Sequence, residues 1–118
     1  MMKILYEDRR VYEQAIYLPL VLAVLEYDRK ATENSSFKMK QVYLNLIEHT
    51  VIKVQKDLKL IQNKMRVKQM KLLKGANDGI CTPYTFYYHD WHETHRYDNA
   101  NLKSTTEKVL LFYFMKES

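Results

Sequence analysis

The predicted fold is decided by residues 36–74, SFKMKQVYLNLIEHTVIKVQKDLKLIQNKMRVKQMKLLK, which contain neither glycine nor proline. An unbroken helix of this length would extend for about 60 Å, at 1.5 Å per residue. Apolar residues recur along it at steps of four and three: Tyr43, Ile47, Val51, Val54, Leu58, Ile61 and Met65. A seam of this kind predicts packing along an antiparallel neighbouring helix.

The far end of this long helix has weaker support from the seam. Lys68 stands where the pattern next requires an apolar residue, and Leu72 resumes the pattern. We therefore expect the final two turns either to be more solvated or to project from the body of the protein.

A first helix is predicted over residues 7–31, before the capping-rich segment TENSS. Its inner face is formed by residues at steps of four and three: Val11, Ala15, Leu18, Leu22 and Leu25. The apolar run Ala15–Leu25 is shorter than the roughly 20 residues of a membrane span, so we expect a central core helix and no membrane span. Pro19 predicts a kink, or alternatively the first turn of a separate helix.

Residues 75–98 are predicted to form a loop and an aromatic segment. Gly75 suits the C-cap of the long helix, and the sequence Asn77–Gly79 suits a turn. Tyr84–Tyr88 is aromatic and favours a short extended or hairpin segment. The residue pattern of Trp91–Asn101 does not distinguish a helix from a strand.

A last helix is predicted at about residues 101–116. Ser104 and Glu107 have the spacing of a capping box, and Asp98, Asn99 or Asn101 are earlier alternatives for the cap. The fold class expected from these elements is mainly all-α: a three-helix antiparallel bundle with one very long central helix, and a short β-like aromatic segment before the last helix. Two glycines and two prolines among 118 residues also favour a few long helices in a single domain, residues 1–118.

The composition favours a non-enzymatic cytoplasmic protein. Cys81 is the only cysteine, and Met1–Arg10 is charged rather than leader-like, so we expect a reducing compartment. No sequence pattern pairs Cys81 with a base, and no glycine-rich loop could hold a phosphate. We therefore expect no catalytic residues and no cofactor.

Positive charge is concentrated in the long helix. Residues 35–74 contain ten basic and two acidic residues, a net +8, whereas the whole chain is +5, so the remainder is −3. One hypothesis is therefore a nucleic-acid or other polyanion site at the far end of the helix, formed by Lys64, Arg66, Lys68, Lys71 and Lys74. Helical spacing spreads the basic residues around the exposed surface, and the sequence lacks a nucleic-acid recognition motif, so this hypothesis is not favoured.

A histidine cluster supports a third hypothesis, metal binding. His89, His92 and His95 lie three residues apart, and on a helix His92 and His95 would share a face. The spacing His-Glu-x-x-His of zinc helices is absent. The alternative is a polar turn whose histidines make ordinary hydrogen bonds.

Nine of the 15 aromatic residues occur in the last 35 residues, where we expect most of them to fill the core. The surplus is predicted to form a partner-binding surface that includes Tyr87, Trp91, Phe112 and Phe114. Our leading hypothesis is accordingly a small interaction protein that binds a protein partner or itself. We expect a dimer, formed through the seam or through the aromatic C-terminal third.

Four stretches of the sequence carry a family resemblance: YLPLVLAVLEYD (17–28), FKMKQVYLNLIE (37–48), QKDL (55–58) and YTFYYHDWHETHRYDN (84–99). They resemble the YhjD-like family of small uncharacterised proteins from Bacillus-type bacteria, over nearly the whole chain. The resemblance implies an intracellular bacterial protein that is not an enzyme. It implies no catalytic or binding residues.

Overall fold

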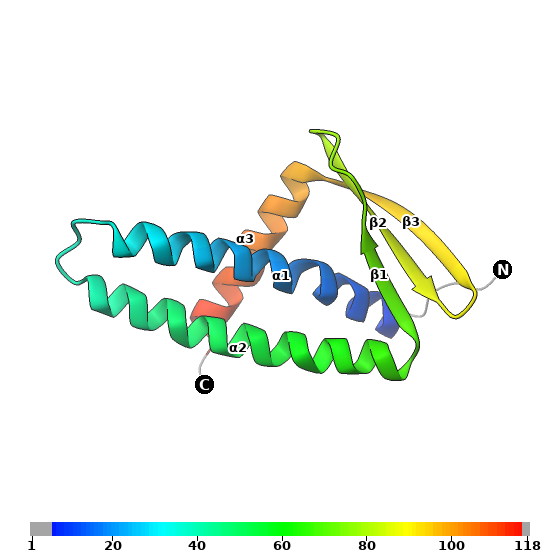
Figure 1. The fold of residues 1–118 in the computed structure, drawn as a ribbon, viewed down its shortest axis with the longest axis horizontal. Helices are drawn as coiled ribbons and strands as arrows, with labels where there is room; N and C mark the ends of the chain where they lie inside the picture. The colour runs from blue at the N-terminus through cyan, green and yellow to red at the C-terminus, as the bar shows by residue number, and fades with distance from the viewer. Residues whose placement is uncertain (1–5, 117–118) are drawn as a thin grey trace.

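The structure, a computed structural model, describes residues 6–116 and contains both helices and a sheet (Figure 1). Its elements in chain order are α1 (Tyr6–Glu33), α2 (Lys40–Val67), β1 (Met70–Lys74), β2 (Cys81–Tyr88), β3 (Trp91–Asp98) and α3 (Asn99–Met115). The predicted all-α three-helix bundle is therefore wrong, because the chain has an α+β arrangement. The predicted domain limits within residues 1–5 and 117–118 lie outside the described residues.

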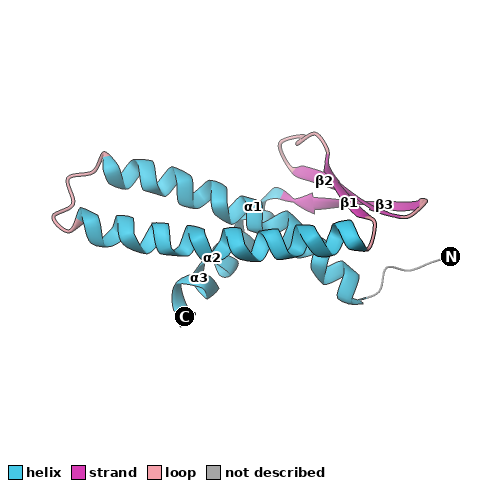
Figure 2. Ribbon diagram, turned by 60° about the horizontal axis from the view of Figure 1, so that its bottom comes forward, coloured by secondary structure: helices cyan, strands magenta, loops and turns pink. Residues whose placement is uncertain are grey.

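The helices α1 and α2 form an antiparallel hairpin in which they lie side by side (Figures 1 and 2). The predicted seam of α2 packs along α1, as expected. Its buried members are Ile47, Val54, Ile61 and Met65, and Val51 and Leu58 pack partly buried against the same core. Tyr43 departs from the prediction, because it is 48% exposed near the tip of the hairpin.

The helix α1 is central, as its apolar faces predict. Tyr12, Val21 and Leu25 are completely buried between α2, α3 and the sheet. Pro19 lies inside one continuous helix, so the alternative of a separate helix starting there is wrong. In the described residues, no helix combines the length and the apolar character that crossing a membrane requires.

The predicted helix to Lys74 is wrong beyond Val67. Lys68 is the C-cap of α2, and Gln69 has a left-handed backbone with φ 57°, which ends the helix. The chain then enters β1, where Met70 and Leu72 lie opposite Tyr88 and Phe86. Pairing with these aromatic residues of β2 stabilises a strand where the local pattern predicted two more helical turns.

The three strands form an antiparallel sheet in the order β1-β2-β3. Alternate residues of β2 point inward, and Thr82, Tyr84 and Phe86 are buried. The Tyr12 ring of α1 stacks on Phe86 with the ring centroids 4.5 Å apart. The predicted extended segment at Tyr84–Tyr88 is thus confirmed as part of a longer strand.

The loop between β1 and β2 contains both glycines. Gly75 follows β1 and is not the helix C-cap that was predicted, and a Cβ there would lie 2.7 Å from Cγ of Pro83. Gly79 has φ 96°, and its N–H donates to Oδ1 of Asn77 at 2.8 Å. The predicted turn at Asn77–Gly79 is confirmed.

The helix α3 leaves the sheet and crosses α1 toward the middle of α2 (Figures 1 and 2). Its N-cap is Asp98, whose Oδ1 accepts from the N–H of Ala100 at 2.8 Å. Ser104 and Glu107 lie inside the helix, so the capping box is wrong and Asp98 is the correct alternative. The Tyr113 hydroxyl donates to Oδ2 of Asp57 at 2.6 Å, which ties the end of α3 to α2.

Candidate functional site

The histidines proposed as metal ligands do not converge. His92 and His95 lie on β3, where alternate side chains point to opposite faces of the sheet, so they do not share the face that a helix would have given them. His95 packs against Phe86 on the inner face, and His92 packs against Tyr87 on the outer face. His89 lies in the β2–β3 turn, where its Nδ1 is 3.0 Å from Oε1 of Gln69.

The inner-face histidine belongs to an ion-pair chain with α1. His95 Nε2 lies 2.7 Å from Oε1 of Glu93, and the same oxygen accepts from the Arg9 guanidinium at 3.1 Å. Between residues 6 and 116, no three His, Cys, Asp or Glu side chains gather closely enough to hold a metal ion. Metal binding at His89, His92 and His95 stays a prediction that these positions do not favour.

The basic residues proposed for polyanion binding are divided among different surfaces. Lys64 and Lys68 line a groove between α1 and α2, and Lys68 donates to the buried Asp8 carboxylate at 2.8 Å. This hydrogen bond and the charge of Asp8 raise the pKa of Lys68. Arg66 binds Asn63 on α2, whereas Lys71 and Lys74 point to opposite faces of β1. The polyanion site stays a prediction without a continuous surface to support it.

The four aromatic residues proposed as an interface also lie in different places. Tyr87 and Trp91 are half-buried on opposite faces of the sheet. Phe112 and Phe114 lie on α3, where they are 61% and 38% exposed. The two phenylalanines are exposed, but they are two residues apart on a helix and therefore point to opposite sides of α3.

The hairpin extends beyond α3 at its free end (Figure 1), and several exposed apolar side chains lie on this part. On α2 and just before it, Met39, Val42 and Leu46 follow one another at steps of three and four, and they are 67%, 61% and 44% exposed. Leu46 precedes Lys53 by seven residues, and Lys53 contacts the end of α3 through the carbonyl oxygen of Lys116 at 3.4 Å. These side chains therefore point to the side of the hairpin on which α3 lies.

The helix α1 contributes to the same surface. Leu20 and Val24 face α3 across a cleft, and Tyr27 continues their row three residues later. Val24 is 37% exposed and Tyr27 is 75% exposed. Phe114, four residues after the cleft residue Leu110, borders this surface from α3. We call the six exposed side chains the apolar shelf: Val24, Tyr27, Met39, Val42, Leu46 and Phe114.

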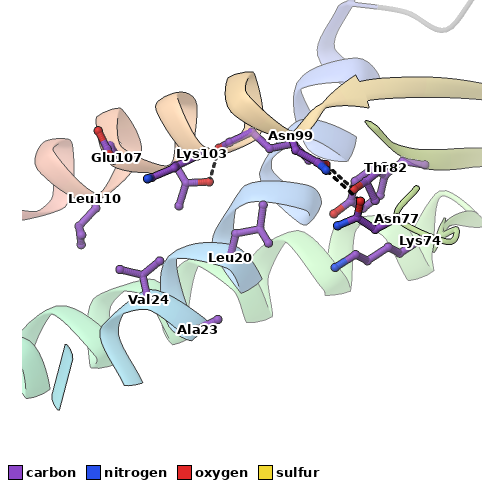
Figure 3. Close-up of a pocket in the computed structure, with 13 residues that line it drawn as sticks. Leu20, Ala23, Val24, Lys74, Asn77, Thr82, Asn99, Lys103, Glu107 and Leu110 are labelled. Carbon is purple, nitrogen blue, oxygen red and sulfur yellow. Dashed lines mark hydrogen bonds between the residues drawn. The ribbon is translucent and has the colours of Figure 1, made fainter. Parts of the chain in front are cut away.

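The cleft itself lies between α1 and α3 and has a volume of about 430 Å³ (Figure 3). One end is closed by a hydrogen-bond network that joins the sheet, the β1–β2 loop and the start of α3. The Thr82 hydroxyl donates to Oδ1 of Asn99 at 2.7 Å, and Nδ2 of Asn99 donates to Oδ1 of Asn77 at 2.9 Å. Thr82 is 3% exposed and Asn77 is exposed, so the network is buried at Thr82 and open to solvent at the β1–β2 loop.

Two lysines and one carboxylate give the cleft its charge. Lys74 enters from β1, whereas Lys103 and Glu107 lie one helical turn apart on α3 (Figure 3). Neither lysine forms an ion pair with any of residues 6–116. Burial raises the pKa of Tyr84, so its phenol is a neutral wall of the cleft at physiological pH.

The sequence reasoning did not identify the shelf or the cleft. The steps of three and four from Met39 to Leu46 were present beside the seam and could have indicated a second apolar row. The cleft had no such signal, because its walls come from α1, α3 and the sheet, and their approach depends on the tertiary fold.

Comparisons with known proteins agree with the family resemblance. Residues 3–118 match the sequence model of a family described as YhjD protein. The chain is 29% identical over 101 residues to a Bacillus subtilis (strain 168) protein named Uncharacterized protein YhjD, which covers 86% of this chain and 84% of that protein. No solved structure matches the chain. The chain belongs to the YhjD protein family.

Proposed function

We propose that this YhjD-family chain is a non-enzymatic interaction protein that forms a dimer through its apolar shelf. The observation that carries the proposal is the gathering of six large apolar side chains, each 37–75% exposed, on one side of the hairpin. Large exposed apolar side chains gathered on one side of a protein are typical of protein-binding sites. The shelf contains no carboxylate, imidazole, amine or thiol, so the proposal concerns binding and not catalysis.

A second copy of the chain is the partner that fits the shelf best. In a two-fold dimer the same patch contacts itself, and an apolar patch needs no matching charges to be self-complementary. Two hairpins stacked shelf to shelf would place four helices around a common apolar core, which is the packing of a four-helix bundle. The seam of α2 is not available for this role, because its central residues are already buried against α1.

The size of the shelf is compatible with a stable contact. Large side chains at these exposures present on the order of 100 Å² each. Six of them supply most of the roughly 800 Å² per partner that a standard interface buries. The neighbouring exposed residues Leu111 and Met115 of α3 would extend the same contact.

A charge placed on the shelf tests this proposal. Leu46→Glu would bury a carboxylate at the centre of the dimer contact, and we expect it to leave a monomer. The matched control is Ile52→Glu, on the same helix and 56% exposed, but turned about 120° away from Leu46. Light scattering after size-exclusion chromatography gives the mass of both variants and of the unmodified chain.

The expected result is a dimer for the unmodified chain and for Ile52→Glu, with a monomer only for Leu46→Glu. Helix content by circular dichroism should be the same in all three, since both positions are on the surface. Equal effects of the two substitutions on the mass would contradict a role for the shelf, as would a monomeric unmodified chain.

A further inference from the structure

We propose that the cleft between α1 and α3 binds a medium-chain carboxylate, with its apolar chain along the helices and its head group at Lys74. The cleft and the shelf are different surfaces that share only Val24. The inference therefore does not depend on the proposed dimer.

The volume of the cleft selects the size of the ligand. Its 430 Å³ lies within the range of small-molecule sites, about 300–1,000 Å³. A methylene group occupies roughly the 30 Å³ of a water molecule, so an acyl chain of about ten to twelve carbons and its carboxylate fill the space.

The walls of the cleft suit an unbranched apolar chain. Leu20, Ala23 and Val24 of α1 line the cleft from one side, and Leu110 of α3 lines it from the other (Figure 3). Leu102 of α3 is also part of the lining. Ala23 contributes a small, exposed side chain to this wall. Burial of methylene groups against these side chains stabilises the complex through the hydrophobic effect.

The polar end of the cleft suits a single negative charge. The Lys74 ammonium group comes from the inner face of β1 and lies beside the Asn77–Asn99–Thr82 network. Asn99 is also the first residue of α3, and the Asp98 carboxylate that caps this helix is not among the residues that line the cleft. The lining contains Lys74, Lys103 and Glu107, a net charge of +1. This balance matches a monoanion and disfavours a cationic amphiphile.

The test is a calorimetric titration of the full chain with dodecanoate, below the concentration at which dodecanoate forms micelles. We expect saturable binding of one ligand per chain. Dodecyltrimethylammonium has the same apolar chain with a positive head group, and we expect it to bind at least about tenfold more weakly, since it loses a charge-assisted hydrogen bond. Equal binding of the two amphiphiles, or no binding of dodecanoate, would overturn the proposal.

Matched variants locate the ligand. Lys74→Ala should weaken dodecanoate binding by about tenfold. Lys71→Ala removes the same charge from the same strand but on its other face, and it should change the affinity by less than about twofold. The same loss in both variants would show that only net charge matters, and it would rule out a head-group site at Lys74.

Filling the cleft separates it from the shelf. Ala23 is exposed, so Ala23→Trp should be tolerated by the fold and should abolish dodecanoate binding by occupying the path of the chain. Leu46→Glu, on the shelf, should leave binding unchanged. The reverse pattern, binding that survives Ala23→Trp and is lost in Leu46→Glu, would place the ligand on the shelf and refute the cleft site.

Discussion

Tyr12 is the residue that most closely joins the helical hairpin to the sheet. Its side chain is completely buried, its ring stacks on Phe86, and its hydroxyl donates to the backbone carbonyl of Tyr87. A phenol at this position supplies both a large apolar surface and a hydrogen bond. Tyr12 therefore fixes how the sheet sits against α1.

Alkaline pH should destabilise the protein through Tyr12. Burial, together with the nearby charge of Asp8, raises the pKa of Tyr12 from 10.0 to about 12. The folded state thus favours the protonated phenol, and this contribution is complete below pH 10 and is lost as the pH rises toward 12. A shift of this size corresponds to about 2–3 kcal/mol of unfolding free energy, measurable by denaturant titration at a series of pH values.

The variant Tyr12→Phe isolates this effect. It should cost about 1 kcal/mol near neutral pH, because the Tyr87 carbonyl loses its hydrogen bond. In this variant the unfolding free energy should fall less steeply at alkaline pH, but it should still fall, because burial also raises the pKa of Tyr97 to about 12. An unchanged pH profile in Tyr12→Phe would contradict the assignment of this stability to Tyr12.

The histidines show why single residues were hard to place from the sequence. The spacing of three between His92 and His95 puts them on one face of a helix and on opposite faces of a strand. Whether the two histidines share a face therefore depends on their secondary structure. The sequence from Trp91 to Asn101 did not indicate whether it forms a helix or a strand. Pairing of β3 with β2 made the choice, and that pairing depends on partners outside the local segment.

Among the elements, the largest error of the sequence-based prediction was the end of α2, which was placed at Lys74 instead of before β1. The seam predicted the packing of α2 as far as Met65, because every contact there is made with a neighbouring helix at regular steps. Beyond it, Leu72 fits the helical step, but Met70 and Leu72 also fit the two-residue step of a strand. The partners that stabilise the strand are Phe86 and Tyr88, more than a dozen residues later in the chain.

The start of α3 can be tested by a single substitution. Asp98→Ala removes the acceptor of the Ala100 N–H, and we expect it to lower the unfolding free energy by about 1 kcal/mol. The control Asp98→Asn keeps an acceptor at the same atom position and should lose only a few tenths of that value. Denaturant unfolding measures both variants, and an equal loss in the two would mean that charge, not capping, determines the effect.

For the whole molecule, the decisive feature is that the hairpin is longer than the elements that cover it. The protein measures 57 × 33 × 18 Å, with the sheet at one end of the hairpin and α3 across its middle (Figures 1 and 2). Toward the free end, Met39, Val42 and Leu46 stay exposed on the α3 side, where a folded chain would normally bury large apolar residues. This mismatch is the physical basis of the proposed dimer.

The sequence could predict a long hairpin, but not which of its residues would stay exposed. The aromatic surplus predicted Phe112 and Phe114 for a partner-binding surface, and both are exposed side chains of α3. It did not distinguish them from Tyr87 and Trp91, which the sheet half-buries. Exposure of the shelf depends on where α3 crosses the hairpin. The sheet from which α3 leaves sets that position, and the all-α prediction did not include a sheet.

Sedimentation equilibrium of the unmodified chain across a dilution series tests the proposed dimer most directly. The chain has a mass of 14.3 kDa, so the account predicts a mass near twice this value at high concentration. Dilution should move it reversibly toward the single-chain mass. A mass of 14.3 kDa at every concentration would contradict the claim that the shelf joins two copies of this protein.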